Sequence, residues 1–426
     1  MKVLAFLLSL MIYFSNMYVK ADVLFVWSQV VSNNNLSVRA IISAEDDCPK
    51  INVDSKIRRM SVRALPVYNK SAVFNNKVCE AVISNTAKII KVNTNIVPAI
   101  PNKIKKIAII GDTGCRISLY YEQNCKSQDK WPLERILYQV SQHNPDLVIH
   151  VGDYLYREKS CSDNTKCNKG VYGDNFNTWK LDWLDPSKLL SKKAPFIFVR
   201  GNHEDCNRAY RGWFRYLSAS SFVDVDKALC KNIVDSWIFT PKQLGIGDLN
   251  FYIYDSSNIS EMLFSKQDIK NVRSRFLNKL HHESPMWLLT HRPLWSYIER
   301  RNVPYYGSLL QVKAFSNLLP RNLLAIVSGH VHIGQILRMK MKDNIVTQII
   351  VGNSGTKLDN VKLLKMHNVK IGNFIADSIQ SVKNFGFTIV NVNTKYSHVK
   401  YYDVNNNEVY QLKILNESIA KKISCK

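Results

Sequence analysis

The sequence predicts an α/β protein preceded by a small all-β region, and three observations support this. Residues 22–100 contain short apolar segments with alternating polar residues and no helical period, which is typical of a β-sandwich. From Ile104 onward, short apolar runs alternate with helical stretches, which predicts sheets flanked by helices. With 426 residues, 46% of them hydrophobic, the chain is long enough for two or three domains with large packed cores.

The first 21 residues have the pattern of a secretory signal peptide. Lys2 precedes an apolar run from Val3 to Phe14, and the segment ends in a small-residue cleavage site near Ala21. The alternative is a membrane anchor, but the run is short for a span of about 20 residues. We therefore expect an exported protein, periplasmic or secreted, with a signal peptide at 1–21, a β-sandwich domain at 22–100 and a catalytic domain at 101–426. No later segment is expected to cross a membrane.

The predicted strands can be placed along the chain. In the β region they are the segments DVLFVWSQVV, LSVRAIIS, KVCEAVIS and AKIIKVN, followed by the proline-containing linker IVPAIPNKIKK. In the α/β region the strands are IAII, DLVIHV, PFIFV, FYIYD, MWLLT, LLAIV and VTQIIV, and PLERILYQVSQH is the clearest helix. Residues 158–178 have no periodicity and are predicted to form a long loop.

The nine cysteines fit an oxidising compartment, where they can form disulfides. Connectivity does not follow from sequence alone, and pairing of sequence neighbours is our hypothesis. No CxxC motif indicates a zinc knuckle. The predicted pairs are Cys48 with Cys79, Cys115 with Cys125, Cys161 with Cys167 and Cys206 with Cys230, which leaves Cys425 unpaired.

The formal net charge of +24 favours anionic partners such as phosphorylated substrates. Lysine and asparagine are abundant throughout the chain, and no single basic tract stands out. The charge therefore does not predict specific nucleic-acid binding.

Polar clusters follow five of the predicted strands, and their combination predicts a metal site. Each cluster alone is weak evidence, because a Gly-Asp after a strand is usually a turn and a lone histidine is usually structural. Two neighbouring cations need a shared anionic bridge, and imidazole and amide ligands complete their coordination. In an extended His-x-His segment both rings would point to one side. The clusters contain Asp112, Asp153, Asn202 with His203, His291, and His330 with His332.

These motifs, in the order GDTG, GDYLY, GNHE, LLTHRP and SGHVH, resemble those of the calcineurin-like metallophosphoesterase superfamily, and in particular purple acid phosphatases and their bacterial relatives. The resemblance implies two facing β-sheets flanked by helices. It also implies a dinuclear metal centre of iron plus a divalent ion, which would be iron, zinc or manganese. By the same resemblance Asp153 bridges the ions, and His203 is the acid or the phosphate-binding group. The first ion would be bound by Asp112 and His332, and the second by Asn202, His291 and His330.

Tyr156 is the predicted replacement for a missing ligand. Many relatives have a histidine two residues after the first aspartate, where this chain has Gly114. Purple acid phosphatases instead use a tyrosine three residues after the bridging aspartate, which here is Tyr156. A bound cation can deprotonate a tyrosine whose pKa is normally near 10. The alternative is that Tyr156 is a core residue, with Tyr154 pointing elsewhere.

The expected reaction is hydrolysis of a phosphate ester, most simply a phosphomonoester, by a metal-bound hydroxide. The alternatives are a phosphodiesterase or nucleotide hydrolase, or a non-catalytic exported protein built on the same fold. Asn202, His203 and Arg292 would contact the substrate. The sequence after GHVH, IGQILR, departs from the plant and animal enzymes, so further pocket contacts are not carried over. Arg157, Arg200 and Arg292 flank the motifs and could clamp phosphate oxygens, but the default expectation for each is a solvated surface side chain.

Overall fold

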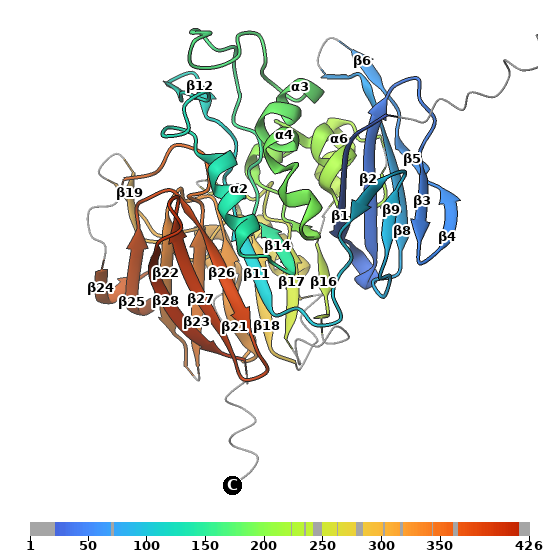
Figure 1. The fold of residues 1–426 in the computed structure, drawn as a ribbon. Coiled ribbons are helices and arrows are strands. Elements are labelled where there is room, and N and C mark those ends of the chain that lie inside the picture. The colour runs from blue at the N-terminus through green and yellow to red at the C-terminus, as the bar shows by residue number, and fades with distance from the viewer. Residues whose placement is uncertain are drawn as a thin grey trace, which may run out of the picture.

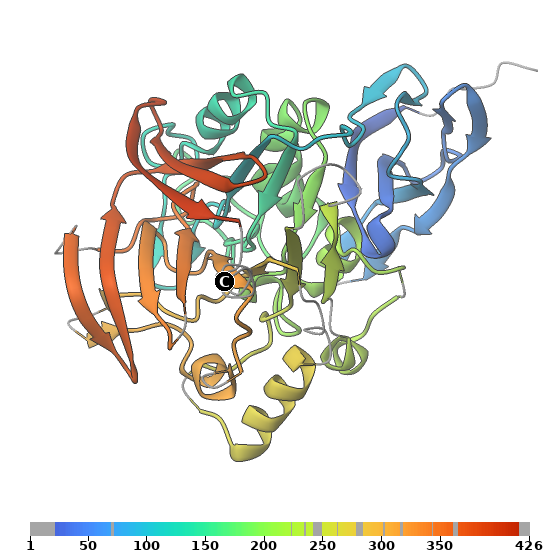
Figure 2. The same cartoon turned by 90° about the horizontal axis from the view of Figure 1, so that it is seen from below.

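The computed structural model describes residues 22–416 except for 70–71, 223, 234–235, 242–248, 262, 278–283, 301–302, 316–317, 343 and 361–364. The predicted signal peptide and Cys425 lie outside these residues. Two large β-sheets face each other and carry helices on their outer faces, which confirms the α/β prediction (Figures 1 and 2). None of the helices in the described ranges is both long and apolar enough to span a bilayer.

The first large sheet has ten strands. Its centre is formed by β11, β14 and β15, which run parallel, as expected for buried apolar strands separated by helices. In spatial order its strands are β28 (Glu408–Leu415), β27 (Tyr396–Asp403), β26 (Gly386–Val392), β11 (Lys106–Ile110), β14 (Leu147–His150), β15 (Phe196–Phe198), β1 (Val23–Val30), β2 (Leu36–Ser43), β8 (Asn76–Ile83) and β5 (Ser61–Ala64).

The second large sheet has eight strands, of which β17, β18, β21 and β23 run parallel. Antiparallel strands complete it at both sides. In spatial order the strands are β16 (Trp237–Phe239), β17 (Asn250–Tyr254), β18 (Met286–Thr290), β21 (Leu323–Ser328), β23 (Ile345–Val351), β22 (Gly334–Lys340), β25 (Phe374–Val382) and β24 (Lys365–Ile371).

The side-chain alternation of each strand divides the core into layers. In β11, Ile107 and Ile109 belong to the core between the sheets, whereas Ala108 and Ile110 face the helices. Helix α7 packs with α8 on the outer face of the second sheet, as Figure 2 shows. The helices are α2 (Leu133–Gln142), α3 (Phe176–Trp179), α4 (Asp185–Ser187), α5 (Tyr210–Gly212), α6 (Lys227–Asn232), α7 (Lys266–Leu277) and α8 (Leu309–Phe315), with π-helical turns at Lys180–Leu184 and Trp213–Leu217.

The N-terminal region is all-β, as predicted, but its main sheet is continuous with the first large sheet. Strand β1 meets β15 in parallel, with Gln29 opposite Phe196. A four-stranded sheet of this region consists of β10 (Asn95–Val97), β9 (Ile90–Val92), β3 (Lys50–Val53) and β4 (Lys56–Arg59). The division between two domains at residues 100 and 101 therefore stays a prediction. Three strand pairs complete the fold: β6 (Val67–Asn69) with β7 (Ala72–Phe74), β12 (Ile117–Ser118) with β13 (Tyr121–Glu122), and β19 (Ile298–Arg300) with β20 (Val303–Tyr305).

The described part of the chain contains four disulfides, and each joins the pair of sequence neighbours that was predicted. By closing loops they restrict the unfolded chain and so stabilise the fold. They are Cys48–Cys79, Cys115–Cys125, Cys161–Cys167 and Cys206–Cys230.

Candidate metal centre

The polar clusters predicted from the sequence meet at one edge of the two sheets. Parallel strands place their carboxyl ends side by side, so the residues that follow β11, β14, β15, β18 and β21 come together. Asn202 and His203 lie in a 3₁₀ turn, Asn202–Glu204, directly after β15. The side chains gathered here are buried, and they are Asp112, Asp153, Tyr156, Asn202, His203, His291, His330 and His332.

A first group of potential ligand atoms is formed by Asp112, Tyr156 and His332. The Tyr156 hydroxyl lies 2.9 Å from Asp112 Oδ1 and 2.7 Å from Asp153 Oδ2. Nε2 of His332 lies 3.1 Å from the same hydroxyl and 3.5 Å from Asp112 Oδ1. Two carboxylate oxygens, a phenol oxygen and an imidazole nitrogen thus converge on one point, a donor set that suits a hard, highly charged cation.

A second group contains Asn202, His291 and His330. Asn202 Oδ1 lies 3.0 Å from His291 Nε2 and 2.6 Å from His330 Nδ1. His291 Nε2 lies 3.2 Å from Asp153 Oδ2. Ligand atoms of Asp153, His291 and His330 all lie within 4.8 Å of one another. Nitrogen ligands dominate this group, as suits zinc, manganese or divalent iron.

Asp153 lies between the two groups, and one of its oxygens faces both. Oδ2 contacts Tyr156 and His291, whereas Oδ1 accepts the backbone N–H of His203 at 2.9 Å. Burial and the charge of Asp153 raise the pKa of Asp112 well above its usual range. Burial also opposes ionisation of Asp153, but the neighbouring imidazoles of His291 and His203 hold its pKa well below the usual range.

The proton positions of the three histidines make the site a good fit for cations. Each ring has an outer nitrogen next to a hydrogen-bond acceptor, so the outer nitrogen carries the proton and the inner one presents a lone pair. Each inner lone pair faces an oxygen atom that is also an acceptor, so the two atoms repel each other. A cation bound between them would remove this repulsion. For His291, His332 and His330 the outer acceptors are Val151 O at 2.8 Å, Lys357 O at 3.0 Å and Glu261 Oε1 at 2.7 Å.

The two tyrosines of GDYLY point in different directions. Tyr154 is fully buried among aromatic rings, and its hydroxyl donates to Val199 O at 3.1 Å. Tyr156 enters the first ligand group. Gly114 lies against this turn, and a Cβ atom there would meet Tyr154 O at 2.4 Å. Position 114 therefore has no room for a histidine, and the space is taken by the backbone that delivers Tyr156.

Three of the site residues have left-handed backbone conformations. The φ angles are +54° at Asp112, +61° at Asp153 and +69° at His330. Such angles cost about 1–3 kcal/mol each for residues other than glycine and are typical of functional sites. The angle at His330 also corrects the sequence argument, because the His-x-His segment is bent and not extended. His330 is fixed by its N–H, which donates to the Asp112 carboxylate at 2.9 Å.

His203 lies beside the metal-ligand groups and lines a cavity of about 510 Å³. Its Nε2 lies 4.0 Å from Asp153 Oδ2, and its Nδ1 lies 3.4 Å from Glu158 Oε1. Burial lowers the pKa of His203 well below its usual range. The charged residues lining the cavity besides His203 are Arg157, Glu158, Asp174, Arg208, Arg211 and Lys227.

The three arginines beside the motifs are buried, so the expectation of solvated side chains is wrong. Arg157, Arg200 and Arg292 are 4%, 1% and 8% exposed. Each is held by a carboxylate that the sequence did not identify. The pairs are Arg157 with Asp182 at 2.6 Å, Arg200 with Asp255 at 3.4 Å and Arg292 with Glu261 at 2.8 Å. Phosphate binding by Arg292 stays a prediction.

Glu204, the last residue of GNHE, was not assigned a role from the sequence, although it lies in a motif. Its carboxylate accepts the backbone N–H groups of Asp153, Tyr154 and Leu155 at 3.2, 2.9 and 3.2 Å. It also accepts the N–H of Gly201 at 3.2 Å. Glu204 thus holds together the two turns that carry Asp153 and Asn202.

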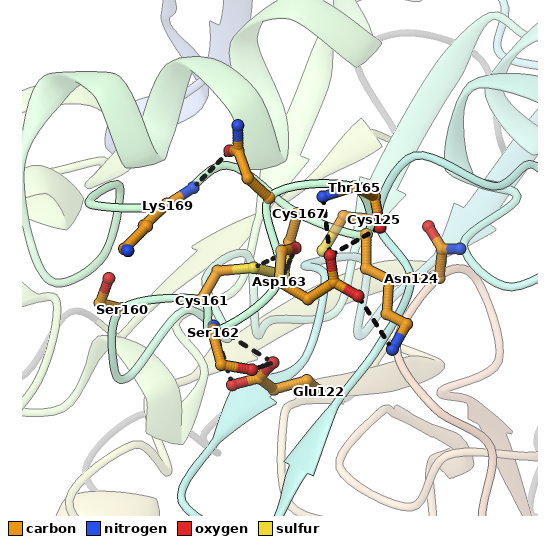
Figure 3. The surroundings of a disulfide bond; sticks show 12 residues. Glu122, Asn124, Cys125, Ser160, Cys161, Ser162, Asp163, Thr165, Cys167 and Lys169 are labelled. Atoms are coloured by element: carbon orange, nitrogen blue, oxygen red, sulfur yellow. Dashed lines mark hydrogen bonds and ion pairs between the residues drawn. A yellow bond between two sulfur atoms is a disulfide. The ribbon is translucent and has the colours of Figure 1, made fainter.

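The predicted loop at 158–178 is irregular as far as Asn175, and helix α3 then begins at Phe176. Figure 3 shows how the loop is fixed near the Cys161–Cys167 disulfide. The Glu122 carboxylate of β13 accepts the N–H of Ser162 at 3.2 Å (Figure 3). Glu122 also pairs with Lys159 at 2.8 Å. The loop is thereby tied to the β12–β13 hairpin.

Comparison with known proteins identifies the family and the fold. The profile of the family described as calcineurin-like phosphoesterase matches residues 105–334. The structure resembles purple acid phosphatase PPD1 from yellow lupin (Lupinus luteus) seeds, with 12% identity over 93% of this chain and 74% of that chain and a TM-score of 0.61. It also resembles PhoD, with 12% identity over 93% of this chain and 90% of that chain and a TM-score of 0.53. No curated protein matches the sequence at a significant level.

At these identities the two structures support the fold alone. The profile, in contrast, spans more than half of the chain and contains all five polar clusters. This chain therefore belongs to the calcineurin-like phosphoesterase family, whose members hydrolyse phosphate esters.

Proposed function

We propose that the protein is an exported phosphomonoesterase with a dinuclear metal centre. The observation that carries the proposal is the position of Asp153 Oδ2, which lies 2.7 Å from the Tyr156 hydroxyl and 3.2 Å from His291 Nε2. One oxygen is thus shared by two groups of ligand atoms. Asp112, Tyr156 and His332 would hold the first ion, for which iron is our choice. Asn202, His291 and His330 would hold a divalent iron, zinc or manganese ion.

When bound, the two ions supply an activated water and neutralise the phosphate oxygens. The protein itself contributes side chains placed around the reacting phosphate. To protonate the leaving oxygen from Nε2, His203 would have to be in its imidazolium form, which burial opposes and which Glu158, 3.4 Å from Nδ1, would stabilise. Asn202 would also orient the phosphate.

The cavity beside His203 is proposed to receive the leaving group. Four cationic side chains line it, those of Arg157, Arg208, Arg211 and Lys227. Arg157 is paired with Asp182, and Arg208 lies 3.7 Å from Glu158 Oε1. Two acidic side chains, Glu158 and Asp174, also line the cavity, and burial raises the pKa of Asp174 to about 6. The excess of positive charge favours leaving groups that carry an anionic substituent.

The reaction class is tested by comparing p-nitrophenyl phosphate with its bis ester on purified protein of known metal content. We expect a higher kcat/KM for the monoester. Faster hydrolysis of the bis ester would favour the phosphodiesterase alternative, and no turnover of either ester by protein containing two ions would favour a non-catalytic protein.

Export is supported by the four disulfides, because disulfides persist mainly outside the reducing cytosol. The proposed signal peptide is tested by N-terminal sequencing of the mature protein. A mature N-terminus near Asp22 is expected, and a chain that retains Met1 would contradict cleavage.

A further inference from the structure

We propose that Glu261 is a positioning residue that sets the affinity of the second metal site by holding His330. The proposal rests on the dinuclear centre of the proposed function and adds a residue that no motif contains. Glu261 lies in the segment after β17, whose carboxyl end faces the same edge of the sheets as the metal-ligand groups.

Among the described residues, Glu261 Oε1 contacts three side chains. It lies 2.7 Å from His330 Nε2 and 2.8 Å from Arg292 Nη1, and it accepts the Tyr305 hydroxyl at 2.7 Å. The Glu261 side chain is 22% exposed. A carboxylate held by a guanidinium and a phenol has a fixed position, and it can therefore fix the imidazole that it contacts.

The orientation of His330 depends on this contact. Nε2 lies 2.7 Å from Glu261 Oε1 and 3.4 Å from Arg292 Nη1. A proton on Nε2 would be donated to the nearer carboxylate, and Nδ1 would then keep a lone pair directed at Asn202 Oδ1, 2.6 Å away. Without the carboxylate, the other tautomer of His330 would place a proton on Nδ1 and remove a ligand from the second site. Glu261 thus selects the tautomer that can bind a metal ion.

The outer nitrogens of the other two ligand histidines each lie next to a backbone carbonyl. His291 and His332 have neutral backbone carbonyls at their outer nitrogens, at 2.8 and 3.0 Å. A carboxylate partner increases the basicity of an imidazole more than a carbonyl does. The contact between Glu261 and His330 therefore acts on a ligand of the second ion.

The test is metal binding and not activity. Apo-protein is first loaded with Fe³⁺, and Zn²⁺ is then titrated against a competing chelator. Glu261→Ala should bind the second ion about 10–100-fold more weakly than wild type, the usual effect of removing an outer partner of a ligand histidine. The visible absorption band of Fe³⁺ bound to Tyr156 should stay unchanged. Glu261→Gln keeps an oxygen acceptor without the charge, so a smaller loss is expected.

Glu122→Ala is the matched control. Glu122 is also a carboxylate with an ion pair and hydrogen bonds between segments, at Lys159 and Ser162, but it contacts none of the proposed ligands. The Glu122→Ala variant should bind zinc with the same affinity as wild type. Wild-type zinc affinity in Glu261→Ala, or an equal loss at both sites, would overturn the role of Glu261. If Glu261→Ala does not fold, Glu261→Gln decides the question. Failure of wild type to bind a second ion would instead refute the dinuclear centre.

Discussion

Replacement of His203 by alanine tests the assignment of the general acid. The imidazole lies beside the metal-ligand groups and lines the cavity, 4.0 Å from Asp153 Oδ2, where a leaving oxygen can reach it. General acid catalysis contributes about 10²–10⁴-fold in rate, or about 3–5 kcal/mol of transition-state stabilisation. His203→Ala should lose this factor with an alkyl phosphate, whose leaving group must be protonated. With p-nitrophenyl phosphate, whose leaving group departs as an anion, the loss should be much smaller.

The assay is kcat/KM for both esters, with the metal content of each protein measured in parallel. Metal content should be unchanged, because the proposed ligands do not include His203. An equal loss with both esters would refute the role as acid and favour phosphate binding. A loss of metal would show that His203 supports the ligands themselves.

Three further predictions follow from the charged groups. Arg39 and Arg63 outweigh the effect of burial and lower the pKa of Glu80 from 4.5 to about 2. Glu80 therefore contributes about 3 kcal/mol to the free energy of unfolding above pH 4.5, and this contribution is lost as the pH falls towards 2. In urea unfolding, Glu80→Gln should be less stable than wild type at pH 7, and the two should converge in acid. A difference in unfolding free energy that does not depend on pH would contradict the assignment. Asp153→Ala should lose bound metal together with activity, and two tightly bound ions in this variant would exclude the bridge. Arg208→Gln should lower kcat/KM about two- to fivefold for 4-carboxyphenyl phosphate but not for phenyl phosphate, and equal effects on both esters would exclude charge recognition in the cavity.

The strands and the convergence of the polar clusters could be predicted because they depend on local patterns. Continuous apolar runs form the parallel strands, and each carboxyl end delivers its polar residues to the same edge. Tyr156 could be placed beside Asp112 only through the family resemblance, because strict alternation from Asp153 would direct it away. The left-handed angle at Asp153 turns the chain so that both side chains face the site.

Other features depend on contacts between distant segments. Glu261 lies 69 positions before His330, and nothing in the residues around it indicates the contact. The burial of the arginines could not be predicted for the same reason. Arg200, for example, meets its partner Asp255 only when the two large sheets face each other. The continuity of the N-terminal strands with the first sheet was missed because it rests on the short contact between β1 and β15.

The central claim is that two ions bind around Asp153 and that Tyr156 supplies the ligand for which position 114 has no room. The most direct measurement is the visible spectrum and metal content of iron-loaded, oxidised protein. Wild type should contain two ions and show the charge-transfer band of a phenolate bound to Fe³⁺. Tyr156→Phe should lose this band, and Tyr154→Phe should retain it, because the Tyr154 hydroxyl is bonded to Val199 O. Iron-loaded wild type without a visible band, or an unchanged band in Tyr156→Phe, would contradict the account.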